Sequence, residues 1–230
     1  MIPTPDLSHL TSKDYALIYE PAEDTFLLLD ALESDAQDLK NSKPLICLEV
    51  GSGSGCVSSF IAQILGPSVL YLCTDINPYA CRYSERTGSQ NKVSLECINV
   101  SFASPLMARL RRQVGVILFN PPYVPTEYEE AQAAQQDKTI AGAWAGGYDG
   151  MQVTNTFLEM VEGLLSELGH FYLVALKQNN IPEIRQRMLR EHGLESEIVL
   201  QRRAGREHLF ILRFTRRNHC NYAAKVTQPR

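Results

Sequence analysis

The 230-residue sequence predicts an α/β fold in which helices cover both faces of a seven-stranded, mostly parallel sheet. Short β-branched and apolar runs alternate with longer amphipathic ones, a loop with three glycines follows the first strand, and a short turn joins the last two strands. This length suits a single domain, 1–230. We expect an N-terminal extension at 1–20, a catalytic core at 21–215 and a loose tail at 216–230.

Each element has its own local signal. Pro21 and the acidic residues after it are typical of a helix start and predict a helix over 21–40. The parallel strands share a β-branched and apolar composition and are expected at 44–50, 68–75, 93–100, 114–119 and 170–177. Further helices are expected at 56–65, 78–88, 151–168 and 182–193, and a hairpin that turns near Gly205 at 195–216. The polar, glycine-rich stretch 125–150 has no clear periodicity and predicts a functional or mobile loop.

The composition limits the classes of protein. No apolar run approaches the ~18–20 residues that span a bilayer, so no membrane segment is expected. The six cysteines form no C-x-x-C pair and predict no metal site. Cys47, Cys73 and Cys97 lie in strand-like runs, which indicates a reducing compartment and predicts a cytoplasmic protein, with a nuclear pool also allowed.

Charge is unevenly distributed along the chain. The net charge is -4, yet residues 1–176 carry 10 basic and 21 acidic side chains, whereas residues 177–230 carry 12 basic and 5 acidic ones. The basic end is either a surface for RNA or an acidic partner, or a solvated helix face and strand rim. The net acidity gives no support for nucleic acid as a binding partner, so direct binding of nucleic acid is not expected.

The glycine loop LEVGSGSGCV joins the first strand to the next helix and contains Gly51, Gly53 and Gly55. Glycine lets the backbone approach a ligand closely, and the helix that follows offers its N-terminal amides. The spacing is G-x-G-x-G and differs from the dinucleotide fingerprint G-x-G-x-x-G. A simple tight turn is the alternative interpretation.

Two acids at strand ends favour a ligand site over a turn. Glu49 ends the first strand and Asp75 ends the second, where a carboxylate can accept hydrogen bonds from ribose hydroxyls. A carboxylate at Glu49 would repel a pyrophosphate but suits an ammonium or a sulfonium group, and S-adenosylmethionine has both.

The fourth strand ends in the tetrapeptide Asn120, Pro121, Pro122 and Tyr123. Two consecutive prolines end the strand and make its end rigid, and a lone Asn-Pro often begins a turn. Next to the glycine loop, however, the Asn120 side-chain oxygen and the Pro121 carbonyl can accept both hydrogens of one planar NH2 group. Tyr123 could stack on that group and exclude water.

GSGSG, CTDINP and NPPYV in this order resemble the Rossmann-like class I S-adenosylmethionine-dependent methyltransferases that modify planar NH2 groups. This acceptor is shared by adenine-N6 DNA methyltransferases and release-factor glutamine methyltransferases. YEPAEDTFLLLDAL (19–32) and AWAGGYDGMQV (143–153) resemble the eukaryotic and archaeal release-factor glutamine methyltransferase family. The resemblance covers about 19–214 and leaves no room for a DNA target-recognition domain.

The resemblance implies a role for each site residue. Thr25, Glu49 and Gly51 would line the methionine end of the cofactor, S-adenosyl-L-methionine, and Asp75 would bind its ribose. Gly53 would also bind the cofactor. Asn120, Pro121, Pro122 and Tyr123 would hold the acceptor, and Asn120 would also border the cofactor. The family has an Asp at the adenine amino group where this chain has Ser101, followed by Phe102. Asn99 or a backbone carbonyl is a candidate substitute for that acceptor.

The implied substrate is the glutamine of the Gly-Gly-Gln motif in the class I peptide-chain release factor, methylated on its side-chain nitrogen (N5). Eukaryotic members are similar in needing a small zinc-binding activator subunit as heterodimer partner, which joins the sheet edge. Residues 93–98 are the expected edge strand, unless a helix or loop of this chain already shields it. The alternatives are an adenine-N6 nucleic-acid methyltransferase and a catalytically silent cofactor-binding scaffold.

Overall fold

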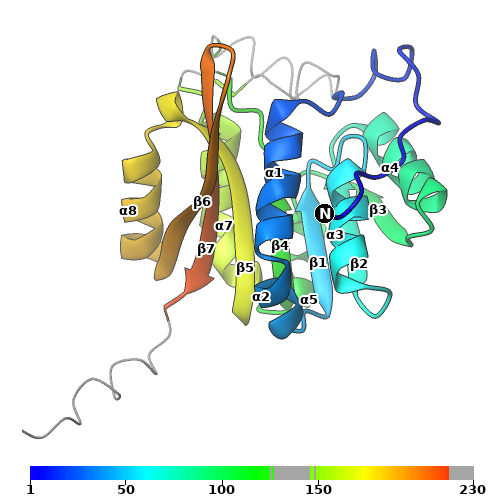
Figure 1. Ribbon diagram of the computed structural model, residues 1–230. Helices are drawn as coiled ribbons and strands as arrows, with labels where there is room; N and C mark the ends of the chain where they lie inside the picture. The colour runs from blue at the N-terminus through cyan, green and yellow to red at the C-terminus, as the bar shows by residue number, and fades with distance from the viewer. Residues whose placement is uncertain (125, 127–145, 148, 218–230) are drawn as a thin grey trace, which may run out of the picture.

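One seven-stranded sheet organises the described part of the computed structural model, residues 1–124, 126, 146–147 and 149–217 (Figure 1). The strand order is β3-β2-β1-β4-β5-β7-β6. Neighbours from β3 to β5 pair in parallel, whereas β7 pairs antiparallel with both β5 and β6. The predicted parallel sheet with a terminal antiparallel hairpin is therefore confirmed. The bounds are β1 Ile46–Val50, β2 Leu70–Asp75, β3 Leu95–Asn99, β4 Val114–Phe119, β5 Leu165–Leu176, β6 Leu194–Ala204 and β7 Glu207–Arg216.

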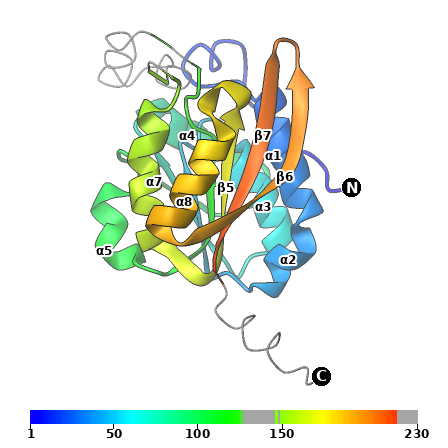
Figure 2. The ribbon, with the colours of Figure 1, turned by 90° about the vertical axis from the view of Figure 1, so that its left-hand side faces the viewer.

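Helices cover both faces of this sheet (Figure 2). One layer contains α1 (Glu23–Ser34), α2 (Ala36–Asn41) and α3 (Cys56–Leu65), and α4 (Pro78–Gln90) packs beside α3 against β2 and β3. The opposite layer contains α5 (Met107–Leu110), α7 (Gln152–Leu164) and α8 (Ile181–His192), with 3-10 turns η1 at Ser104–Leu106 and η3 at Lys177–Asn179. Within the described residues, none of these helices combines the length and apolar composition needed to cross a membrane.

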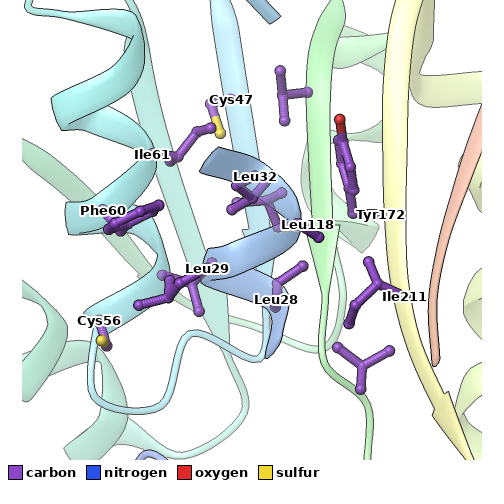
Figure 3. Close-up of a cluster of buried hydrophobic side chains, with 14 of the residues drawn as sticks. Leu28, Leu29, Leu32, Cys47, Cys56, Phe60, Ile61, Leu118, Tyr172 and Ile211 are labelled. Carbon is purple, nitrogen blue, oxygen red and sulfur yellow. The ribbon is translucent and has the colours of Figure 1, made fainter. Parts of the chain in front are cut away.

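The core consists of two apolar clusters, one on each face of the sheet. Successive strand residues point to opposite faces, so Cys47 joins the cluster under α1 and α3 while Leu48 joins the cluster under α7 and α8. Figure 3 shows the first cluster, in which Leu28 and Leu32 of α1 face Tyr172 of β5. This packing fixes α1 over the centre of the sheet, and its N-terminus lies beside the loops that follow β1 and β4.

Two predicted boundaries were wrong. The helix expected over 21–40 is broken at Asp35, whose side chain accepts hydrogen bonds from Tyr172 Oη at 2.7 Å and Arg213 Nη1 at 2.8 Å. The helix expected over 151–168 ends at Leu164, because Leu165 is extended and pairs with Val114 of β4. Both endings are set by tertiary contacts. Most of the loop predicted at 125–150, and the tail beyond residue 217, lie outside the described residues.

Candidate active site

A cavity opens at the carboxyl ends of β1, β2 and β4, where open α/β sheets bind their ligands. Its walls come from the N-terminus of α1, the glycine loop after β1, the end of β2 and the tetrapeptide after β4. The structure brings every residue predicted for the site to this cavity: Thr25, Glu49, Gly51, Gly53, Asp75, Ser101, Phe102, Asn120, Pro121, Pro122 and Tyr123.

The glycine loop is held against the end of β2. Gly51, Gly53 and Gly55 all have positive φ, at 71°, 52° and 76°. The Gly51 N–H donates to the Thr74 carbonyl at 2.7 Å, and the Gly53 N–H donates to Asp75 Oδ2 at 3.0 Å. At Gly55 the backbone also passes α4 closely, because an added Cβ would lie 2.7 Å from Ser84 Cα. Glycine at position 55 is therefore needed for conformation and for space.

Asp75 closes this loop from the end of β2. Besides the Gly53 N–H, its carboxylate accepts from the Asn77 N–H at 2.8 Å. Burial raises the pKa of Asp75, and these backbone donors act in the opposite direction. Each oxygen keeps a further lone pair, so the carboxylate can still accept from ribose hydroxyls.

Glu49 lies deeper in the wall and is only 5% exposed. It accepts from the Ser58 N–H at 2.9 Å and from the Ser58 hydroxyl, both in the first turns of α3. Burial raises the pKa of Glu49 to about 8, although both hydrogen bonds from Ser58 lower it. A cationic group placed beside Glu49 would favour its charged form, as expected for a ligand with an ammonium group.

Glu49→Gln should make the free energy of unfolding less sensitive to pH. The pKa of Glu49 is about 8 in the folded protein against 4.5 for an ordinary Glu, so between these values the folded protein keeps a proton that the unfolded chain has released. The resulting stability is full below about pH 4.5 and is lost as the pH rises toward 8. Between about pH 5 and pH 8 the variant should gain roughly 3 to 4 kcal/mol on wild type in urea unfolding. An exposed control, Glu96→Gln, should show no such gain. A stability difference between Glu49→Gln and wild type that does not change with pH would contradict the raised pKa of Glu49.

Asn120 is held by an acid that the sequence reasoning missed. Its Nδ2 donates to Asp24 Oδ2 at 2.9 Å, and the Tyr123 hydroxyl donates to the same oxygen at 2.8 Å. Asn120 Oδ1 is buried and has no hydrogen-bond partner in the described part of the chain. Since buried polar atoms are nearly always paired, this oxygen is an acceptor site for a ligand at the cavity wall.

Tyr19, Asp24 and Glu207 are among the further residues that border the cavity and were not predicted as site residues. The Tyr19 hydroxyl also donates to Asp24, whereas Glu207 is the first residue of β7 and brings the terminal hairpin to the site. Burial raises the pKa of both Tyr19 and Tyr123, so both keep their hydroxyl protons at neutral pH. Tyr19 and Asp24 lie in the stretch 19–32 that carries the family resemblance, yet Asp24 was explained there as one of two acids that favour a helix start.

Ser101 and Phe102 form the corner where the family's Asp was expected. Phe102 has a positive φ of 50° and its ring stacks on Phe157 at 5.8 Å between centroids. Asn99 is not among the residues that border the cavity, and its Nδ2 donates to the carbonyls of Asp75 and Ile76, each at 2.9 Å. The Nδ2 group of Asn99 is therefore used to hold the end of β2, and Asn99 is not placed at the cavity wall where the missing carboxylate was expected.

Gly146 and Gly150 lie directly against the tetrapeptide. An added Cβ at Gly146 would lie 2.7 Å from the Pro122 carbonyl oxygen, and one at Gly150 would overlap the Tyr123 carbonyl oxygen. The Gly146 N–H donates to the Val124 carbonyl and the Thr126 N–H donates to the Gly147 carbonyl, each at 2.9 Å. These contacts hold residues 122–124 in place. They explain why the segment AWAGGYDG has glycine at positions 146 and 150, where a side chain would not fit.

The sheet order and this cavity define a class I S-adenosylmethionine-dependent methyltransferase. The residues present fit that cofactor: a glycine loop at the end of β1, an acid at the end of β2, a buried acid suited to an ammonium group, and an Asn120 oxygen that no other described residue contacts as a donor. When bound, S-adenosylmethionine supplies an electrophilic methyl group on a sulfonium.

Comparison with known proteins narrows the class. Residues 23–145, just over half of the chain, match the family model Methyltransferase small domain. The human Methyltransferase HEMK2 is 45% identical over 93% of this chain and 96% of its own length. The Schizosaccharomyces pombe eRF1 methyltransferase catalytic subunit mtq2 is 42% identical over 94% of this chain and 96% of its own. The chain belongs to the release-factor glutamine methyltransferase family.

A solved structure supports the same assignment. The fold resembles the E. cuniculi Mtq2–Trm112 complex, described as responsible for methylation of the eRF1 translation termination factor. The TM-score is 0.63 and the identity 25%, and the match covers 87% of this chain and 99% of the other.

Proposed function

We propose that this chain transfers the methyl group of S-adenosylmethionine to the side-chain amide nitrogen (N5) of the glutamine in the Gly-Gly-Gln motif of the class I peptide-chain release factor. Asn120 Oδ1 at the end of β4 carries this proposal, because it has no hydrogen-bond partner among the described residues and would present an acceptor to an NH2 group at the cavity. Family membership and the eRF1 methyltransferase named among the relatives support the choice of substrate.

The reaction needs the acceptor nitrogen to be held in place. An amide nitrogen is a poor nucleophile, since its lone pair is delocalised into the carbonyl. Asn120 Oδ1 and the Pro121 carbonyl would accept its two hydrogens and align the nitrogen with the methyl carbon. The bond between the methyl carbon and the sulfonium sulfur would break as the new C–N bond forms, which leaves a neutral thioether. Positive charge would grow on the NH2 group, where both acceptors would stabilise it, and the nitrogen would then release one proton to solvent. Pro121 and Pro122 restrict the backbone that carries these acceptors, so little reorganisation is needed.

The remaining site residues are assigned to the cofactor. Thr25, Glu49, Gly51 and Gly53 would line the methionine end, Asp75 would bind the ribose, and Ser101 and Phe102 would border the adenine. Tyr123 is only 8% exposed and borders the cavity, so its ring would form an apolar wall beside the acceptor and exclude water.

Adenine-N6 methylation is the chemically closest alternative, because the same two acceptors would hold an exocyclic amine. Among the described residues, four acidic side chains border the cavity, those of Asp24, Glu49, Asp75 and Glu207, and the net charge of the chain is -4. Glu49 keeps its proton until a cation lies beside it, but the net negative charge still disfavours the phosphate backbone of a nucleic acid. The comparisons also favour a protein substrate over a nucleobase and an enzyme over a silent scaffold.

We also propose a small activator subunit as partner, as in the E. cuniculi complex of Mtq2 with Trm112. β3 is the last strand at its side of the described sheet, and its Glu96 and Asn99 are exposed. A partner strand could add to this edge. We further propose that the activator binds zinc, and a cytoplasmic location with a nuclear pool stays a prediction.

Methyl transfer from labelled S-adenosylmethionine tests the proposal. The chain would be purified with and without the activator and given recombinant release factor, a release factor carrying Asn in place of the Gly-Gly-Gln glutamine, or duplex DNA. Label is expected only on the intact release factor, and more strongly with the activator. Label on DNA alone would select the alternative, and no label on any acceptor would contradict the assigned activity.

A further inference from the structure

We infer that Asp24 is a positioning residue that fixes the Asn120 side-chain amide in the one orientation that can accept the substrate NH2 group. The inference rests on the proposed function, since it concerns how the same acceptor is held. Asp24 lies in the first turn of α1, 96 positions before Asn120, and its side chain is 3% exposed.

The orientation follows from the chemistry of the two groups. A carboxylate only accepts hydrogen bonds, so the Asn120 atom that contacts Asp24 Oδ2 at 2.9 Å must be the Nδ2 donor. Oδ1 is then on the other side of the amide, where it is buried and unpaired among the described residues. With the amide reversed, an oxygen would face the carboxylate and the NH2 donors would face the substrate NH2 group. Both contacts would be lost.

Asp24 is itself held rigidly. Its Oδ1 accepts from the Thr25 N–H at 2.7 Å, and the Tyr19 hydroxyl lies 3.1 Å from Oδ1 and 3.0 Å from Oδ2. Tyr123 donates to Oδ2 at 2.8 Å, next to the Asn120 contact. The position in the first turn of α1 also favours a negative charge. The Asn120 side chain is therefore held by α1, which packs across the centre of the sheet, as well as by the loop that follows β4.

Asp24→Asn tests the inference in the chain purified with its activator. The variant keeps the shape of the side chain but can present an NH2 group to Asn120, so the Asn120 amide is no longer forced into one orientation. We expect kcat for release-factor methylation to fall by about 30- to 100-fold. The dissociation constant of S-adenosylmethionine, measured by calorimetry, should change less than threefold. Asp35→Asn is the matched control, because Asp35 also accepts from a tyrosine, Tyr172, yet lies outside the cavity. It should leave kcat unchanged.

The exchange variant Asp24→Asn with Asn120→Asp gives a readout that a purely structural role would not move. It restores one carboxylate and one carboxamide, with the carboxylate now at 120 and certain to present an acceptor. We expect kcat at least tenfold above that of Asp24→Asn. If Asp24→Asn does not fold, the exchange variant is compared with Asn120→Asp, in which two carboxylates face each other. The kcat of the exchange variant should again be at least tenfold higher.

The outcomes separate this inference from the proposed function. Absence of glutamine methylation by the wild-type chain would contradict the proposed function. If the wild type is active, three results would overturn the inference. The first is a kcat of Asp24→Asn within threefold of wild type, and the second is a loss of cofactor affinity as large as the loss of kcat. The third is an exchange variant whose kcat does not show the tenfold excess.

Discussion

Asn120→Ala should reduce kcat for release-factor methylation by about a thousandfold, roughly 4 kcal/mol of transition-state stabilisation. The substitution removes the buried Oδ1 acceptor and leaves the acceptor nitrogen with one partner at most. Single-turnover transfer from labelled S-adenosylmethionine measures this loss without a contribution from product release.

The cofactor dissociation constant should change much less than kcat, because Asn120 mainly contacts the acceptor in the proposed arrangement. Asn91→Ala is a suitable control, since Asn91 contacts Asp6 and Thr87 and does not border the cavity. Its kcat should equal that of wild type. A loss of less than tenfold for Asn120→Ala would remove Asn120 from its assigned role.

Gly55→Ala should lower the free energy of unfolding by about 3–4 kcal/mol. Part of this cost, about 1 kcal/mol or more, comes from the positive φ of 76°. The rest comes from the new Cβ, which would lie 2.7 Å from the backbone Cα of Ser84. Urea unfolding followed by circular dichroism measures the difference.

Gly193→Ala is a control that separates the conformational cost of Gly55→Ala from its steric cost. Gly193 ends α8 with a φ of 64°, and nothing lies within 4 Å of an added Cβ. The control should therefore lose only about 1 kcal/mol. Equal losses at both positions would show that α4 moves away from the glycine loop at no cost.

The elements of the fold could be predicted from local pattern, and the boundaries that failed depend on distant contacts. The β-branched runs identified the parallel strands, and Gly205 identified the hairpin turn. The break at Asp35 needs Tyr172 and Arg213, more than a hundred positions away. The start of β5 at Leu165 needs β4, because Leu164 and Leu165 are both fully buried and suit a helix or a strand equally.

The residues of the candidate site also fall into those with a local sequence signal and those that depend on distant contacts. Residues at strand ends and in the glycine loop could be predicted, since their chemistry coincides with a change of secondary structure. Asp24 and Glu207 could not be. Asp24 meets Asn120 and Tyr123 only after α1 packs across the sheet, and Glu207 reaches the cavity only through the antiparallel placement of β7. Asp24 lies within the stretch 19–32 that carries the family resemblance, but that stretch does not say which side chains its carboxylate meets, and Glu207 lies in no motif.

The backbone hydrogen bonds that Thr126 and Gly146 donate act as a clasp just beyond the tetrapeptide. The Thr126 N–H donates to the Gly147 carbonyl and the Gly146 N–H donates to the Val124 carbonyl, while neither Thr126 nor Gly146 borders the cavity. Substitutions that weaken this pairing should therefore loosen the acceptor end of the site without changing any side chain that lines it.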